Sequence, residues 1–283
     1  MTVAIACTVP DAVILGVDSA VTIGDANNPI KVYEDAEKIF QLGNLPVGIA
    51  IYGAASFGVR TIGNLLREFE LKNPNGVLGK NKKNIKDIVE QMRIFFTAEY
   101  TKTVVPAVEA LKGVPFAQIP DTEKPGLGLV VAGFSIGTFL PEVWNILIPT
   151  HAAPDSAVLQ IASGNLGSAW FASFTPVFRY IKGHDPSLLN DVIGKCEEIH
   201  GAAFTEDQKK SIRDVANKSE YQVVFNAMPV ATGIEYVRFL VQLVISHHKF
   251  ATGAPIVGGC PRIGFVTYRG EQFKILENEV QYA

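Results

Sequence analysis

The chain opens Met1-Thr2-Val3-Ala4-Ile5-Ala6-Cys7, and after a Pro10-Asp11 turn signal it continues Ala12-Val13-Ile14-Leu15-Gly16-Val17-Asp18-Ser19. Both stretches are apolar and rich in β-branched residues, which predicts two strands, 2–9 and 12–18, joined by a tight turn. Apolar side chains occupy successive positions, so both faces of the strands are expected to be covered. We therefore expect a sheet that lies between other layers of the fold.

Thr2 is the first candidate for chemistry, because its side chain is small enough for a methionine aminopeptidase to remove Met1. The processed chain would carry a hydroxyl and a free α-amine on one residue. An α-amine has an ordinary pKa of about 7.7–8.0, so it can accept a proton near neutral pH. A threonine hydroxyl is a weak nucleophile until such a base activates it. Many proteins begin Met-Thr, however, so this dipeptide alone does not indicate catalysis.

Composition narrows the class of protein. The chain has 283 residues, of which 48% are hydrophobic, enough for one large core or two small ones. Only 19% are charged, the net charge is −3, and the sequence has no long charged run. These features argue against a nucleic-acid partner held by phosphate contacts. Three scattered cysteines without metal spacing suggest reduced thiols in a cytoplasmic protein. The start of the sequence lacks the basic region of a signal peptide, so we expect none. The apolar stretch 234–245 is too short and too charged to cross a membrane.

The rest of the chain alternates between strand and helix patterns. Strands are predicted at 38–42, 47–52, 127–134, 139–148, 158–162, 262–268 and 272–276. Helices are predicted at 54–71, at 166–181, within 183–228 and at about 230–250. A further helix is predicted to begin at a cap, Asn84, and to kink or end near Pro106. This order predicts a layered α+β domain whose sheets lie between helical layers.

Several residues could assist Thr2. Lys38 opens a predicted strand, and its charge would lower the pKa of a nearby hydroxyl, with Asp18 pairing with the lysine and holding it. Gly53 and Ala54 lie at a predicted strand-to-helix junction, whose free backbone N–H groups suit an oxyanion. Ser163 ends another predicted strand and offers a hydroxyl. Together these residues would supply a nucleophile, a base, a cation and oxyanion donors.

One motif favours a different enzyme. Gly133-Phe134-Ser135-Ile136-Gly137 matches the G-x-S-x-G elbow of serine esterases, with Asp191 and His247 in the required chain order. The elbow must lead directly into a helix, whereas Thr138–Trp144 is β-rich and contains Pro141. A hairpin turn at Ser135 is the better prediction. Adjacent His247 and His248 do not share a helix face, so we expect no joint metal site there.

The residues around Thr2 resemble the start of proteasome β subunits and of the bacterial HslV peptidase, which are N-terminal-nucleophile (Ntn) hydrolases. The likeness rests on the opening strands, Lys38-Ile39, Gly53-Ala54-Ala55, Ser163-Gly164 and Gly258-Gly259. It implies a four-layer αββα sandwich over 1–283, with a helical insertion at about 183–228. It also implies a threonine peptidase with catalytic Thr2, Asp18, Lys38, Gly53 and Ser163, and Lys31 as the alternative lysine.

The resemblance further implies a homo-oligomeric ring that encloses the nucleophile, a peptide or amide substrate, a possible ATPase or regulator, and no metal or cofactor. One departure favours a catalytically silent assembly subunit instead. Members of the family usually place an acid and a hydroxyl just before the late Gly-Gly, where this chain has Ala254-Pro255-Ile256-Val257. Assembly is expected through the apolar helix around 234–245, unless that helix is buried beneath the 183–228 segment.

Overall fold

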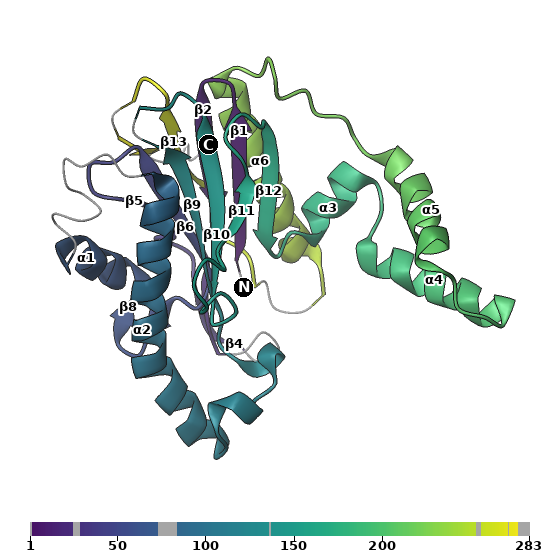
Figure 1. Cartoon of the computed structure of the whole chain (residues 1–283), viewed down its shortest axis with the longest axis horizontal. Coiled ribbons are helices and arrows are strands. Elements are labelled where there is room, and N and C mark those ends of the chain that lie inside the picture. Colours follow the sequence, from purple (N-terminus) through teal and green to yellow (C-terminus); the bar gives the residue numbers. More distant parts are fainter. Residues whose placement is uncertain are drawn as a thin grey trace.

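The computed structural model describes residues 2–24, 29–72, 84–135, 137–252, 256–270 and 272–276. These residues form four layers, with two antiparallel sheets packed face to face between helices (Figure 1). Helices α1 (Ile62–Lys72) and α2 (Ile85–Lys112) cover one sheet. Helices α3 (Thr175–Lys182) and α6 (Val230–Phe250) cover the other. The αββα architecture predicted from the sequence is confirmed.

Each sheet has five strands, and strands distant in sequence are neighbours in space. The first has the order β12 (Gly167–Ala172), β1 (Val3–Val9), β2 (Ala12–Val17), β13 (Arg262–Thr267) and β14 (Lys274–Ile275). The second has the order β11 (Val158–Ile161), β10 (Pro141–Ile148), β9 (Leu127–Phe134), β6 (Val47–Gly53) and β5 (Ile39–Gln41). The start and the end of the chain therefore meet in one sheet.

The burial of β1 and β2 explains their continuous apolar character. Every residue of both strands is buried. Along β1, Ile5 faces the α6 layer, whereas Ala4 and Ala6 face the other sheet. Alternate side chains of a strand point to opposite faces, so a strand between two layers needs apolar residues at every position. Small alanines on the inner face let the sheets approach closely.

Helix α2 begins differently from the prediction. Asn84 occupies the N-cap position, but its side chain makes no capping hydrogen bond. The hydroxyl of Ser135 accepts the Ile85 N–H instead, at 3.0 Å. Pro106 lies inside the helix, which continues to Lys112 and ends where Gly113 adopts a left-handed conformation. The prediction that Asn84 caps the helix through its side chain is therefore wrong, because a residue from another element supplies the acceptor.

Tertiary pairing overrides two predicted helices. The helix expected over 54–71 begins only at Ile62, because a two-stranded hairpin of β7 (Ser56–Phe57) and β8 (Arg60–Thr61) precedes it. The helix expected over 166–181 is β12 followed by the short helix α3. The edge of the first sheet is completed by β12, which pairs with β1 from Val3 to Thr8. Backbone hydrogen bonds to that edge outweigh the local helical pattern.

The segment expected to be a helical insertion forms an arm. Helices α4 (Pro186–His200) and α5 (Glu206–Ala216) extend away from the sandwich, followed by the 3-10 turn η3 (Asn217–Ser219) (Figure 1). A capping box formed by Thr205 and Gln208 starts α5. Because the arm points outward, it does not bury α6, and Phe239 of α6 keeps 45% of its surface exposed. The alternative of a wholly buried α6 is therefore wrong.

Among the helices of the described residues, none combines the length and the apolar character required to cross a membrane. The three cysteines form no disulfide. Cys7 is buried, and burial raises the pKa of its thiol to about 12, whereas Cys196 is exposed on the arm.

Candidate functional site

Thr2 lies at the end of the first sheet, immediately before β1. The register of β1 places Val3 beside Ala172 of β12, and Ala4 beside Val17 of β2. The ends of these strands therefore converge around Thr2, which is 4% exposed. The prediction for Met1 lies outside the described residues. The sheet holds the backbone of Thr2 in a defined position, which an accurately aimed hydroxyl requires.

Lys38 reaches across from the second sheet and joins Thr2 to Asp18. Its Nζ donates hydrogen bonds to Thr2 Oγ1 and to Asp18 Oδ1, each at 2.9 Å. Lys38 directly precedes β5, and Asp18 directly follows β2. All three residues are buried. The structure thus brings together three of the five residues predicted from sequence, and it selects Lys38 over Lys31, which lies in the separate ribbon of β3 (Val21–Gly24) and β4 (Pro29–Tyr33).

Asp18 is held by backbone groups from three segments. Its Oδ1 accepts the Val3 N–H at 3.1 Å, and its Oδ2 accepts the N–H groups of Ala20 and Gly258 at 3.3 Å each. Gly258 belongs to the late Gly-Gly pair singled out in the sequence. These donors fix the carboxylate while leaving it close to Lys38, so Asp18 can orient the lysine.

Burial controls the electrostatics of the pair. Burial raises the pKa of Asp18, and the Lys38 charge and backbone donors oppose that rise. Burial also lowers the pKa of Lys38, and the Asp18 carboxylate opposes that fall. A lysine whose pKa is lowered exchanges a proton more readily near neutral pH than a solvated lysine does. Its ammonium form would in turn stabilise a developing alkoxide on Thr2.

A hydrogen-bonded junction at Ser19 holds these segments together, and the sequence reasoning did not identify it. The Ser19 hydroxyl donates to the carbonyl of Glu34 and accepts the Cys260 N–H at 2.9 Å. The Ser19 carbonyl accepts the Ala36 N–H at 2.8 Å. Gly259 has a left-handed φ of 71°, and a Cβ there would collide with the Ser19 hydroxyl and the Glu34 carbonyl. Ser19 thus ties the chain before Lys38 to the chain after α6.

Ser173 is a second residue at the site that sequence reasoning missed. Its backbone N–H donates to the Thr2 carbonyl at 3.0 Å. The preceding Ala172 has a φ of 61°, which is uncommon for a residue with a Cβ. Such strain often accompanies functional sites. The only sequence signal was the change from an apolar stretch to Ser173-Phe174, and the incorrect helix over 166–181 concealed it.

Ser163 lies at the wrong end of the sheet. It occupies an exposed turn before β12, and Asn165, two residues later, accepts a hydrogen bond from the Thr8 hydroxyl. Thr8 is five residues along β1 from Val3, which corresponds to about 17 Å at roughly 3.4 Å per residue. Because β12 runs antiparallel to β1, its end rather than its beginning lies beside Thr2. The prediction that Ser163 belongs to the site is therefore wrong.

Of the two predicted oxyanion donors, the Ala54 N–H already has a backbone acceptor, whereas the Gly53 N–H stays a candidate. Ala54 N–H donates to the Gly126 carbonyl at 2.7 Å, so it serves the fold. Ile51 N–H donates to the Lys38 carbonyl at 2.9 Å. Alternate N–H groups along an antiparallel strand point to the same side, so the Gly53 N–H points toward the segment that carries Lys38. Gly53 also has a φ of 82°, which favours glycine there.

The esterase alternative fails on geometry. Ser135 is buried, its hydroxyl serves as the acceptor for Ile85 N–H, and the Thr138 N–H turns back to the Ser135 carbonyl at 2.9 Å. Beyond Ile136, which lies outside the described residues, the chain forms the turn into β10 instead of a helix. Asp191 lies in α4 on the outlying arm. The prediction of a hairpin at Ser135 is confirmed.

Across the described ranges, no group of three or more His, Cys, Asp or Glu side chains lies close enough together to hold a metal ion. The arrangement at Thr2 comprises a hydroxyl, an ammonium and a carboxylate. Such groups support nucleophilic and acid–base chemistry.

Fold and site together define a proteasome-like α+β protein with a buried Thr–Lys–Asp cluster at the chain start. Among solved structures, the chain is similar to Anbu (ancestral beta-subunit) from Yersinia bercovieri, with a TM-score of 0.55 and 8% identity over 99% of this chain and 89% of that one. It is also similar to an Anbu (Gly-1) mutant from Hyphomicrobium sp. strain MC1, with a TM-score of 0.55 and 8% identity over 100% and 90% of the two chains.

The sequence comparisons correct the family assignment. No family model matches the chain, and no curated protein matches it either. Assignment to the proteasome β subunit and HslV family on the sequence resemblance is therefore wrong. At 8% identity, the likeness to the Anbu structures shows the fold alone.

Proposed function

We propose that this protein is an amide hydrolase, acting on peptide or other amide bonds, with Thr2 as its nucleophile after Met1 is removed. One observation carries the proposal. A single buried ammonium, Lys38 Nζ, lies 2.9 Å from both the Thr2 hydroxyl and the Asp18 carboxylate. A buried ion pair often adds no stability over apolar side chains of similar volume, so stability alone does not account for this pair.

The reaction follows from the positions of the groups. Thr2 Oγ1 attacks the amide carbonyl carbon, and the hydroxyl proton passes to the α-amine of Thr2. The Lys38 ammonium stabilises the developing negative charge on Oγ1, and Asp18 holds Lys38 in place. The carbonyl π electrons move to oxygen, where the Gly53 N–H is the candidate donor. Collapse of this intermediate breaks the C–N bond, and the leaving amine takes the proton. Water then hydrolyses the resulting ester on Thr2.

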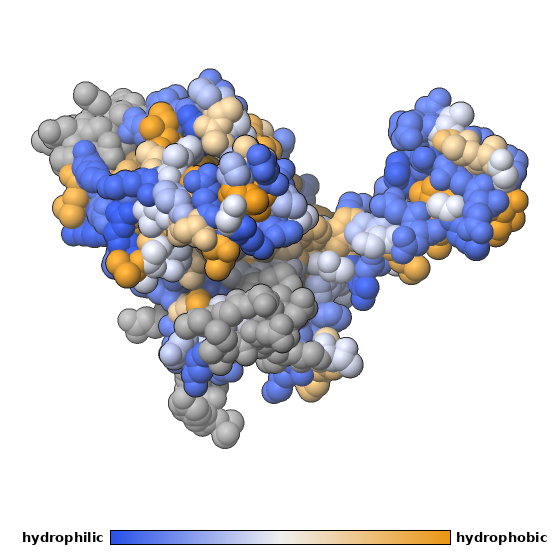
Figure 2. Space-filling model, turned by 90° about the horizontal axis from the view of Figure 1, so that it is seen from below, coloured by the Kyte–Doolittle hydropathy of each residue, from blue (hydrophilic) through white to orange (hydrophobic). Residues whose placement is uncertain are grey.

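Assembly is part of the same proposal. We regard 1–283 as one domain, with 183–228 as an inserted arm, that associates into a homo-oligomer. Tyr180, Tyr221 and Phe239 are exposed, and the Tyr180 ring contacts the other two where the arm leaves the body. Figure 2 also shows apolar surface on the arm. Light scattering tests this step, because a single species near the 30.6 kDa chain mass at micromolar concentration would contradict it.

The decisive experiment is covalent labelling of protein purified from its own host. Intact-mass analysis should show that Met1 is absent, and a β-lactone probe should add one acyl group to Thr2. Thr2→Ala should abolish both labelling and amide hydrolysis while preserving the melting temperature. Ser135→Ala is the control and should label normally. Retention of Met1 in most molecules, or unchanged hydrolysis by Thr2→Ala, would refute the proposal, and the first result would favour a silent assembly subunit.

A further inference from the structure

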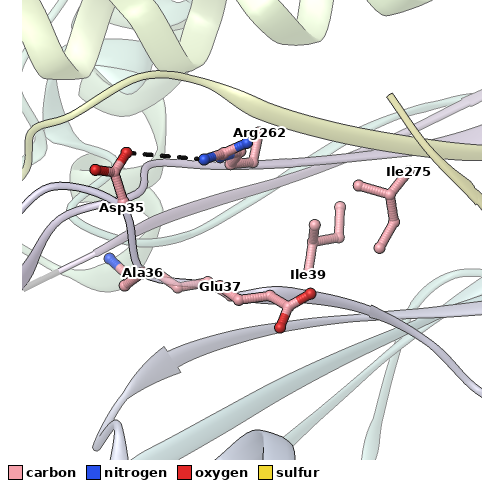
Figure 3. Close-up of a pocket in the computed structure, with 7 residues that line it drawn as sticks. Asp35, Ala36, Glu37, Ile39, Arg262 and Ile275 are labelled. Atoms are coloured by element: carbon pink, nitrogen blue, oxygen red, sulfur yellow. Dashed lines mark ion pairs between the residues drawn. The ribbon is translucent and has the colours of Figure 1, made fainter. Parts of the chain in front are cut away.

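A pocket of about 220 Å³ is lined by Lys38 and by residues on either side of it in the chain (Figure 3). Asp35, Glu37, Lys38 and Ile39 line it from the edge of the second sheet, and Arg262 and Ile275 line it from the edge of the first. The edge strands β5 and β14 therefore bound the pocket between the two sheets. Thr2 is not among the lining residues, whereas Lys38, which donates a hydrogen bond to the Thr2 hydroxyl, is one of them.

Arg262 supplies an available cation in this pocket. Its side chain is 32% exposed, and within the described residues its ion pair is with Asp35 at 3.9 Å. Asp35 is 91% exposed, and such a solvated pair contributes little. A guanidinium presents parallel donors that match a carboxylate far better than this long contact does. A ligand carboxylate could therefore replace Asp35 as the partner of Arg262.

The remaining walls define the rest of the ligand. Ile39 is buried and Ile275 is partly exposed, and both side chains lie on the same side of the pocket in Figure 3. Glu37 is exposed at the rim and carries a second carboxylate. The lining therefore offers a donor for an anion, an apolar surface, and two acceptors for a cation. This combination matches a small molecule that has a carboxylate, an aliphatic side chain and, next to the carboxylate, an ammonium group.

We propose that this pocket binds an aliphatic α-amino acid, or the carboxyl-terminal residue of a short peptide, through its carboxylate at Arg262. The aliphatic side chain contacts Ile39 and Ile275. A free ammonium, when the ligand has one, faces Glu37 or Asp35. The proposal does not depend on hydrolysis by Thr2. It does place the ligand beside Lys38, so that occupancy can affect the lysine that contacts the nucleophile.

Calorimetric or NMR titration tests the pocket in the Thr2→Ala protein, which lacks the proposed nucleophile. The probes are leucine, N-acetyl-leucine and leucinamide, which separate the roles of the carboxylate and the ammonium. Leucine should bind about tenfold or more tightly than leucinamide, because a hydrogen bond to a charged group is lost without the carboxylate. If N-acetyl-leucine binds with the same affinity as leucine, the ligand is the carboxyl terminus of a peptide. If N-acetyl-leucine binds more weakly than leucine, the ligand is a free amino acid.

Variants at one strand locate the binding site. Arg262→Gln should weaken the affinity for leucine about tenfold or more and leave the affinity for leucinamide unchanged. The affinity of Arg262→Lys for leucine should lie between those of wild type and Arg262→Gln. Arg269→Gln is the matched control, since Arg269 is an exposed arginine beyond the other end of β13. No leucine binding at millimolar concentration, equal affinity for leucine and leucinamide, or equal leucine affinity in wild type and Arg262→Gln would overturn the proposal. The ligand comparison needs no variant at position 262, so it decides the matter even if Arg262→Gln does not fold.

Discussion

Replacing Lys38 with Met is the most informative perturbation, because it removes one charge of a buried pair and keeps most of the side-chain volume. Lys38 Nζ lies 2.9 Å from Asp18 Oδ1, and the two side chains are 4% and 0% exposed. At an effective dielectric constant of about 20, that separation corresponds to an attraction of about 6 kcal/mol. Breaking a buried pair costs about 3–5 kcal/mol, because the remaining charge lacks compensation.

The structure places the expected cost near the lower limit. Asp18 would keep its hydrogen bonds from Val3, Ala20 and Gly258. We therefore expect a loss of about 3 kcal/mol, and a melting temperature lower by about 6–10 °C for a chain of this size. Labelling of Thr2 should slow by about 10²–10³-fold, the range for loss of one group that stabilises a developing negative charge.

The assay combines thermal or urea denaturation with the rate of β-lactone labelling. Lys31→Met is the matched control and should change neither, since Lys31 is exposed in the β3–β4 ribbon. Adding Asp18→Asn to Lys38→Met removes the uncompensated charge and should restore most of the stability, but not the labelling. If Lys38→Met labels at the wild-type rate, or melts within about 1 °C of wild type, the reasoning about this pair is wrong. Inactivity of Lys31→Met alone would reassign the lysine.

Other consequences can be measured independently. Gly259→Ala should destabilise the protein by about 1–3 kcal/mol and slow labelling, because a Cβ at a φ of 71° collides with the Ser19 junction, and urea denaturation measures the loss; wild-type stability would show that this junction is loose. Ser135→Ala should cost about 1 kcal/mol through the lost cap of α2, with labelling unchanged, and a slower rate would revive the esterase alternative. Burial raises the pKa of Tyr100 to about 12, so the folded state retains a proton that the unfolded state loses near pH 10; stability should fall as the pH rises from about 10 to 12, and Tyr100→Phe should flatten that part of the curve. Labelling of Thr2 should increase as the pH rises through about 7.7–8.0, where the α-amine loses its proton, and a flat profile would argue against that base.

Local pattern was sufficient for the elements whose own side chains decide their state. The opening strands, the strand 127–134 and the apolar helix at 230–250 were all predicted within a residue or two of their observed bounds. Their apolar residues repeat with the period of the structure they form, so burial and local preference agree. The layered class followed from their order along the chain.

The site was predictable only where it depends on residues at strand ends. Thr2, Asp18 and Lys38 each adjoin a strongly patterned strand, so their neighbourhood could be inferred from the resemblance even though the family assignment was wrong. Their hydrogen bonds confirm that neighbourhood, whereas the roles of the three residues stay a proposal.

Tertiary structure decided the rest, because pairing partners lie far away in sequence. Residues 167–172 have a helical pattern, yet they form β12 because the edge of β1 offers unpaired backbone groups. That pairing places Ser173 at Thr2 and sends Ser163 to the far end of the sheet. The Ser19 junction and the Arg262 pocket likewise join segments more than 200 residues apart. The sequence by itself determined the buried strands and the nucleophile candidate, while the direction and register of β-pairing determined which other side chains reach it.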